Sequence, residues 1–141
     1  MLFRSIRACV EYKHYTSISN SVLCETLAAD VLTHQERYAR EYHRLVGGGL
    51  SILTDWAAAH AAQVRLVPPE GTPFAWLHLR TAESSLSLAR RVLRHGVLVM
   101  PAETFGTERG LRVSFAREPE QLLDGLSRVS QTFAESGERA A

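Results

Sequence analysis

Apolar residues recur at intervals of three and four along several stretches of the chain, the spacing of a helix with one buried face. The longest of these stripes comprises Val46, Leu50, Leu53, Trp56 and Ala57. Three glycines, 47–49, lie inside the stripe, and each costs about 1 kcal/mol relative to alanine in a helix interior. Because the stripe passes through them in phase, we predict one long helix from Thr33 or Gln35 to His60. A break at the glycines and a phosphate-binding loop are the alternatives.

The residues before this helix give a weaker pattern. We predict a short helix or helix end over Ile6–Tyr12 and an extended segment over His14–Ser19, where Tyr, Thr and Ile favour strand or loop. Ser19 or Asn20 is then expected to cap a helix with an apolar stripe at every fourth residue. Thr33 and Glu36 have the spacing of a capping box, which predicts a new helix start at Thr33.

Beyond residue 62 the pattern changes to that of strands alternating with helices. Strands are predicted over Val64–Val67, Phe74–Leu79, Val97–Met100 and Leu111–Ala116. A helix is predicted to begin at Ser84 or Ser85 and to end at Gly96, which can adopt the left-handed conformation of a helix end. Pro119 suits the first turn of a last helix.

This order of elements predicts an α+β two-layer fold, a small mixed β-sheet with helices on one face, preceded by a long domain-linking helix. We expect residues 1–18 to join another domain, residues 19–135 to form the folded domain and residues 136–141 to be a frayed tail.

Composition narrows the function classes. The chain has 141 residues, 45% of them hydrophobic and 22% charged, with a net charge of +1. This balance offers no electrostatic case for nucleic acid, an anionic membrane or an acidic substrate. Cys9 and Cys24 form neither a disulfide framework nor a zinc site, and the six histidines lack metal-ligand spacing. No apolar run reaches the length of a membrane span, so the expected setting is cytoplasmic.

Three segments carry a resemblance to a known family. Residues 110–116 read GLRVSFA, residues 96–106 read GVLVMPAETFG, and residues 69–76 read PEGTPFAW. In sequence, order and spacing they resemble three motifs of the C-terminal small domain of fold-type I, pyridoxal-phosphate-dependent aminotransferases of class I/II. The resemblance covers roughly residues 6–135. Ala102 stands where the family has glycine, which puts the tightness of that turn in question.

The resemblance implies a role for Arg112, because the family's arginine in this strand binds the α-carboxylate of the substrate. The chemistry agrees, since a guanidinium can hold a carboxylate through two parallel hydrogen bonds and an ammonium cannot. By the same resemblance, Gly71, Phe74 and Phe105 are candidate substrate-binding residues. The alternative for Arg112 is an ion pair with a neighbour at a sheet edge.

Other parts of the family's active site have no counterpart in this sequence. The family's Schiff-base lysine, the aspartate of the pyridinium nitrogen and the phosphate-binding residues belong to a large domain. Lys13 is the only lysine, and no comparable motif surrounds it, so we expect a surface residue. The resemblance thus implies pyridoxal 5'-phosphate bound mainly by a missing large domain, no catalytic residue in this chain, and a homodimer when full length. Met1 is either a natural start or the mark of a truncation.

Tyr12, Tyr15 and Thr16 are interface and specificity candidates. Residues 15–17 resemble a segment near the family's dimer interface, and Tyr12 stands where enzymes for dicarboxylic substrates have an arginine. A phenol cannot neutralise a second carboxylate, so an aspartate-type substrate is disfavoured; simple packing of Tyr12 is the alternative. Residues 14–18, His-Tyr-Thr-Ser-Ile, also resemble the capreomycidine-synthase-like branch of the family.

The sequence therefore predicts part of an enzyme that transfers an amino group between an amino acid and a 2-oxo acid. Two alternatives stay open. One is a different pyridoxal-phosphate reaction on the same fold, a cyclisation or elimination. The other is a stand-alone binding or regulatory domain that kept the arginine and has no catalytic activity.

Overall fold

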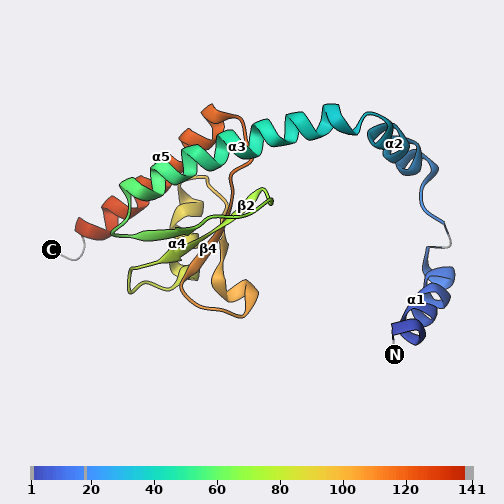
Figure 1. Cartoon of the computed structure of the whole chain (residues 1–141). Helices are drawn as coiled ribbons and strands as arrows, with labels where there is room; N and C mark the ends of the chain where they lie inside the picture. Colours follow the sequence, from blue (N-terminus) through green and yellow to red (C-terminus); the bar gives the residue numbers. More distant parts are fainter. Residues whose placement is uncertain (1, 18, 139–141) are drawn as a thin grey trace. The chain divides into compact units, whose positions relative to one another are not determined.

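The computed structural model describes residues 2–17 and 19–138. The chain divides into two compact units, Met1–Arg40 and Glu41–Ala141, which we describe separately. Figure 1 shows the elements along the chain.

The first unit contains α1 (Leu2–Thr16), α2 (Val22–Thr33) and the beginning of α3. The prediction of an extended segment from His14 was wrong, because helix α1 continues through Tyr15 to Thr16. The Thr16 hydroxyl donates to the carbonyl of Tyr12 at 3.2 Å, one turn back. This local bond lets a β-branched residue remain helical.

The caps of α2 also differ from the prediction. Ser21, rather than Ser19 or Asn20, is the N-cap residue. Thr33 does not form a capping box with Glu36, since its hydroxyl donates to the carbonyl of Ala29 at 2.8 Å within α2. A threonine hydroxyl can bond back to the preceding turn as readily as forward to the next helix, and sequence spacing does not distinguish the two.

The predicted long helix is confirmed as α3, Gln35–Ala59, which runs without interruption through the three glycines. Gly47 and Gly48 are exposed and have open space around them. Gly49 is buried, and a Cβ there would overlap the backbone carbonyl of Phe115. The third glycine therefore lets the helix approach another segment closely.

The second unit is built on a four-stranded sheet in the order β1-β2-β4-β3. Its strands are β1 (Val64–Val67), β2 (Phe74–Leu79), β3 (Met100–Pro101) and β4 (Gly110–Ser114). The α+β two-layer class is confirmed, but all three strand pairs are antiparallel, where we expected a mixed sheet. The strands β2 and β3, joined through a helix, do run parallel, but β4 lies between them and pairs with both.

The predicted strand over Val97–Met100 is much shorter in the structure, where β3 begins at Met100. The residues before it complete the end of α4 (Ser85–Arg94). Gly96 has a φ of +78° and donates to Leu93, while the N–H of Val97 donates to the carbonyl of Val92. This pair of bonds is the Schellman helix end, and it takes the Val97 N–H away from the sheet.

The helices α3, α4 and α5 (Pro119–Glu138) all cover the same face of the sheet, as predicted. Figure 1 shows α3 and α5 running alongside one another over the strands. The core between the two layers joins residues from the sheet and from each helix: Ala57, Leu77, Leu79, Leu88, Val92, Leu111, Val129 and Phe133.

The predicted tail, 136–141, is partly helical, since α5 continues to Glu138; residues 139–141 lie outside the described residues. The predicted domain boundaries at 18 and 135 stay predictions. Among the helices of residues 2–17 and 19–138, none is long and apolar enough to cross a membrane.

Candidate substrate-carboxylate site

Strand alternation places one set of side chains on the sheet face opposite the helices. Along β2, Ala75, Leu77 and Leu79 are buried, whereas Phe74, Trp76 and His78 are not. Residues directly opposite one another in an antiparallel pair share a face. Because Trp76 pairs with Arg112 of β4, Arg112 lies on the same side as the aromatic residues. We call this side of the sheet the open face.

Arg112 occupies the centre of the open face. It is half-buried, with Trp76 as its partner on one neighbouring strand and Met100 as its partner on the other. Its Cζ lies 4.7 Å from the ring centroid of Phe74 and 5.0 Å from that of Phe105. The structure thus brings together three of the predicted site residues.

The neighbours found for Arg112 are the rings of Phe74 and Phe105 and, across the strand pair, Met100. Within the described part of the chain, no ion pair or hydrogen bond occupies its guanidinium. The alternative of an ion pair with a neighbour is therefore not observed. A guanidinium has five N–H donors in a fixed planar arrangement that matches a carboxylate. The geometry leaves these donors available to an anion from outside the domain.

Phe105 reaches Arg112 from a single 3₁₀ turn, η1 (Ala102–Phe105). The turn ends at Gly106, which has a φ of +67° and donates to the carbonyl of Glu103 at 3.2 Å. Ala102, where the family has glycine, is fully buried at the start of the turn. Among the described residues other than glycine, the one with a positive φ is Arg109. Ala102 therefore does not adopt the left-handed conformation, and it fits this turn without that strain.

The other predicted site residues lie elsewhere. Gly71 precedes β2, and its carbonyl accepts a bond of 3.4 Å from the Tyr42 hydroxyl. Tyr12, Tyr15 and Thr16 are exposed residues of α1 in the first unit. Their roles stay predictions.

Two residues of the open face were not selected from the sequence, Trp76 and Gly110. The Trp76 ring meets that of Phe105 edge to face, with centroids 5.7 Å apart. A Cβ at Gly110 would overlap the Trp76 indole. Trp76 lies two positions after Phe74 in the predicted strand 74–79, so strand alternation could have identified it.

The described residues do not form a site for pyridoxal phosphate. Lys13, the only amine side chain, is exposed on α1. Arg112 fits a carboxylate, but it is no Schiff-base nucleophile. No group of three or more metal-ligating side chains gathers among residues 2–17 and 19–138. The group of the open face that could bind an anion is the Arg112 guanidinium.

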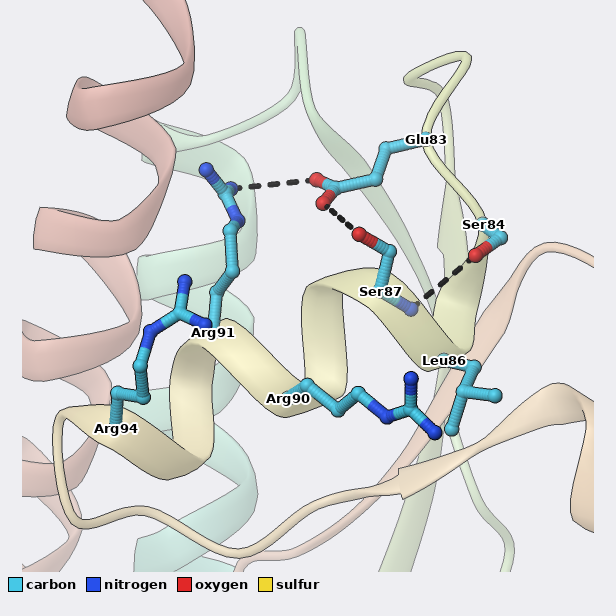
Figure 2. Close-up of a pocket in the computed structure, with 7 residues that line it drawn as sticks. All are labelled: Glu83, Ser84, Leu86, Ser87, Arg90, Arg91 and Arg94. Atoms are coloured by element: carbon cyan, nitrogen blue, oxygen red, sulfur yellow. Dashed lines mark hydrogen bonds and ion pairs between the residues drawn. The ribbon is translucent and has the colours of Figure 1, made fainter.

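A cavity of about 520 Å³ lies beside α4, in the helix layer (Figure 2). Its most buried charge is Arg91, which donates to the carbonyl of Thr132 at 2.9 Å and lies 3.3 Å from the Glu83 carboxylate. Glu83 also accepts a bond of 2.7 Å from Ser87. These bonds tie α4 to α5 and to the preceding loop, so the central ion pair of this cavity stabilises the fold.

The ion pairs of Arg44 connect α3 to the residue before α5. Arg44 bonds Glu41 at 2.8 Å and 3.1 Å, and Glu118 at 2.8 Å. The hydrogen bond from Arg44 lowers the pKa of Glu41 below its ordinary value of 4.5. The bonds to Glu41 and Glu118 raise the pKa of Arg44.

Comparison with known proteins gives matches in sequence and in structure, although no family model matches the chain. Capreomycidine synthase of Streptomyces vinaceus is 28% identical over 123 residues, 86% of this chain and 32% of the synthase. A pyridoxal-phosphate-dependent aminotransferase of Streptococcus suis superposes with a TM-score of 0.82 at 25% identity. The match covers 89% of this chain and 33% of the aminotransferase.

A third match is a pyridoxal-phosphate-dependent cyclase, OrfR, with a TM-score of 0.81 and 28% identity over 92% of this chain and 36% of the cyclase. The chain thus spans about a third of the length of each of these relatives. The resemblance predicted from residues 69–76, 96–106 and 110–116 is confirmed: over about nine tenths of its length the chain matches part of the fold of pyridoxal-phosphate-dependent aminotransferases and cyclases.

Proposed function

We propose that this chain is the substrate-carboxylate-binding part of a pyridoxal-phosphate-dependent enzyme acting on amino acids. The observation that carries the proposal is Arg112, whose guanidinium lies on the open face without an acidic partner among the described residues. The α-carboxylate common to amino acids and 2-oxo acids is the anion that suits it. The reaction proposed first is transfer of an amino group between the two.

The cofactor would be held outside the described residues, by a large domain in the same polypeptide or in a separate chain. Pyridoxal phosphate supplies the electron sink for reactions at the amino acid α-carbon. Arg112 would hold the substrate's carboxylate, and Phe74 and Phe105 would exclude water beside it. Apolar side chains of α2 that remain exposed, Val22, Leu23, Leu27 and Leu32, fit contact with the rest of such an enzyme. A homodimer and a cytoplasmic setting are part of this proposal.

A second reaction, cyclisation, is favoured by one observation. Capreomycidine synthase and the cyclase OrfR are both 28% identical to this chain, slightly more than the aminotransferase of S. suis at 25%. Both reactions need the carboxylate held in place, so Arg112 has the same role in each.

The test is Arg112→Lys in the enzyme assembled with its large domain. A bidentate pair reduced to a point contact loses about 2–4 kcal/mol, so kcat/KM for the amino donor should fall roughly 30- to 1,000-fold. Binding of pyridoxal phosphate should not change. The control is Arg65→Lys, because Arg65 is exposed and pairs with His78 on the same open face. An unchanged kcat/KM in the Arg112 variant would contradict the proposal.

Product analysis separates the reactions. Transamination of an amino donor consumes a 2-oxo acid and yields its amino acid, whereas cyclisation needs no 2-oxo acid. If the chain is instead a stand-alone binding domain, the 141 residues should bind a carboxylate by themselves. No turnover should then be seen with any added large domain.

A further inference from the structure

The side chains of Phe74, Phe105 and Arg112 come together from three separate elements of the chain. Phe74 belongs to β2, Phe105 to η1 and Arg112 to β4. We infer that Phe74 and Phe105 orient the Arg112 guanidinium, and that Trp76, seated on Gly110, holds Phe105 in place. These four would be positioning residues for carboxylate recognition. The inference rests on the proposed function and extends it to residues that do not bind the carboxylate through hydrogen bonds.

Two phenyl rings lie beside the Arg112 guanidinium. Arg112 lies over both, at 4.7 Å from Phe74 and 5.0 Å from Phe105. An aromatic face attracts a cation through its quadrupole and, unlike a carboxylate, carries no charge that would neutralise it. An aspartate in the same place would also fix the arginine, but it would occupy two donors and neutralise the charge. The rings therefore hold the guanidinium while leaving its charge and donors available.

Trp76 packs against Phe105. Its ring meets the Phe105 ring at 76°, an edge-to-face arrangement with centroids 5.7 Å apart. Phe105 is 44% exposed, so solvent borders much of its surface and Trp76 supplies packing that a lone turn residue would lack. Edge-to-face aromatic pairs add specific geometry to simple burial. Trp76 therefore restricts the positions available to Phe105.

Gly110 is buried beneath the Trp76 indole. Its N–H donates to the hydroxyl of Ser85 at 2.8 Å, a buried bond to the first residue of α4. The backbone at Gly110 is thus fixed, and a Cβ added there would overlap the indole. Because the strand cannot move without losing that bond, the indole must move and release Phe105.

The experiment uses the 141-residue chain and the Nε–H signal of Arg112 in two-dimensional NMR, assigned by its loss in Arg112→Lys. Rings that face a guanidinium displace this signal upfield. The inference expects an upfield signal in the wild type and a shift toward the ordinary position in Gly110→Ala and in Phe105→Leu. Phe105→Tyr, which keeps the ring, should leave the signal at the upfield position of the wild type. Gly48→Ala is the matched control, since that glycine has no neighbour within 4 Å.

Titration with pyruvate and with L-alanine then tests the consequence. We expect Phe105→Leu and Gly110→Ala to bind these carboxylates about three- to thirtyfold more weakly, the range of a partly desolvated cation–π contact. An Arg112 signal that does not move in Gly110→Ala would overturn the inference. An affinity that stays at the wild-type value while the signal moves would overturn it equally.

The two proposals fail in different ways. If the wild-type Arg112 signal is upfield but does not respond to either carboxylate, the proposed function loses its support. The packing that leads from Gly110 through Trp76 and Phe105 to Arg112 would still hold as a description of the structure. Circular dichroism of each variant keeps loss of folding apart from both outcomes.

Discussion

The two faces of the sheet are formed by the same strands but differ in what lies on them. On the face covered by helices, Leu77 and Leu111 are each about 1% exposed, and they lie between α4 and α5. On the open face their next neighbours, Trp76 and Arg112, are only half-buried. Displacement by a single residue along the strand thus moves a side chain from the core to the candidate site. Strand parity therefore separates the packed core from the candidate site.

The strongest test of this separation places one substitution on each face. Leu77→Ala should reduce the free energy of unfolding by about 2–5 kcal/mol, since it leaves a cavity in a packed core. His78→Ala, at the next position on the open face, should change it by less than about 0.5 kcal/mol. Urea denaturation followed by circular dichroism measures both. Equal losses would show that the open face is part of the core.

A second test examines how closely the helix layer approaches. Gly49→Ala should destabilise the domain by about 1–3 kcal/mol, because its Cβ would overlap the carbonyl of Phe115. Gly48→Ala, one position earlier in the same helix, meets open space and should stabilise by up to about 1 kcal/mol. Thermal unfolding of the two variants gives opposite shifts. Shifts of the same sign would contradict the observed approach of α3.

The smallest expected effect is on the outer surface of the helix layer. Arg44 lowers the pKa of Glu41. A carboxyl whose pKa is lowered in the folded state stabilises the fold at pH values above its pKa in the unfolded state. This stability is lost as the pH falls through the pKa of the folded state. We therefore expect a small loss of stability below about pH 4.5. Urea midpoints between pH 3 and pH 7 measure it, and Arg44→Gln should make the profile flatter in that range. A profile unaffected by this substitution would exclude the pair as its cause.

Much of the fold could be predicted because local pattern and packing agree. The apolar stripe around Leu53 predicted α3 correctly through its glycines, and the alternation over residues 74–79 gave β2 with both its ends. The apolar run 97–100 predicted too long a strand. Hydrophobicity does not show which backbone N–H groups will bond to the end of the preceding helix, as that of Val97 does. The prediction of an extended segment from His14 was wrong because the strand propensities of Tyr15 and Thr16 are small. Propensities of this size do not determine the conformation of an exposed segment.

Three residues of the candidate site could be named from the sequence, but their arrangement in space could not. Arg112 followed from the GLRVSFA motif, and Phe74 and Phe105 from the other two. What brings the rings to the guanidinium is the register of β2 against β4, in which Trp76 pairs with Arg112. Register depends on long-range pairing, and the place of Phe105 depends on the 3₁₀ turn at residues 102–105. No local pattern specifies either of them. For the same reason the role of Gly110 became visible only in three dimensions.

The place of β4 in the sheet has a consequence for the order in which this domain can assemble during synthesis. β4 is the last of the four strands along the chain, yet it lies between β2 and β3. A nascent chain that has not yet emerged as far as Ser114 has β2 with one edge unpaired and β3 with no neighbour. The sheet is then completed by insertion of its inner strand, which carries Arg112. Until that moment the unpaired edges are a target for strand addition by other chains, and chaperone binding during translation would be most useful there.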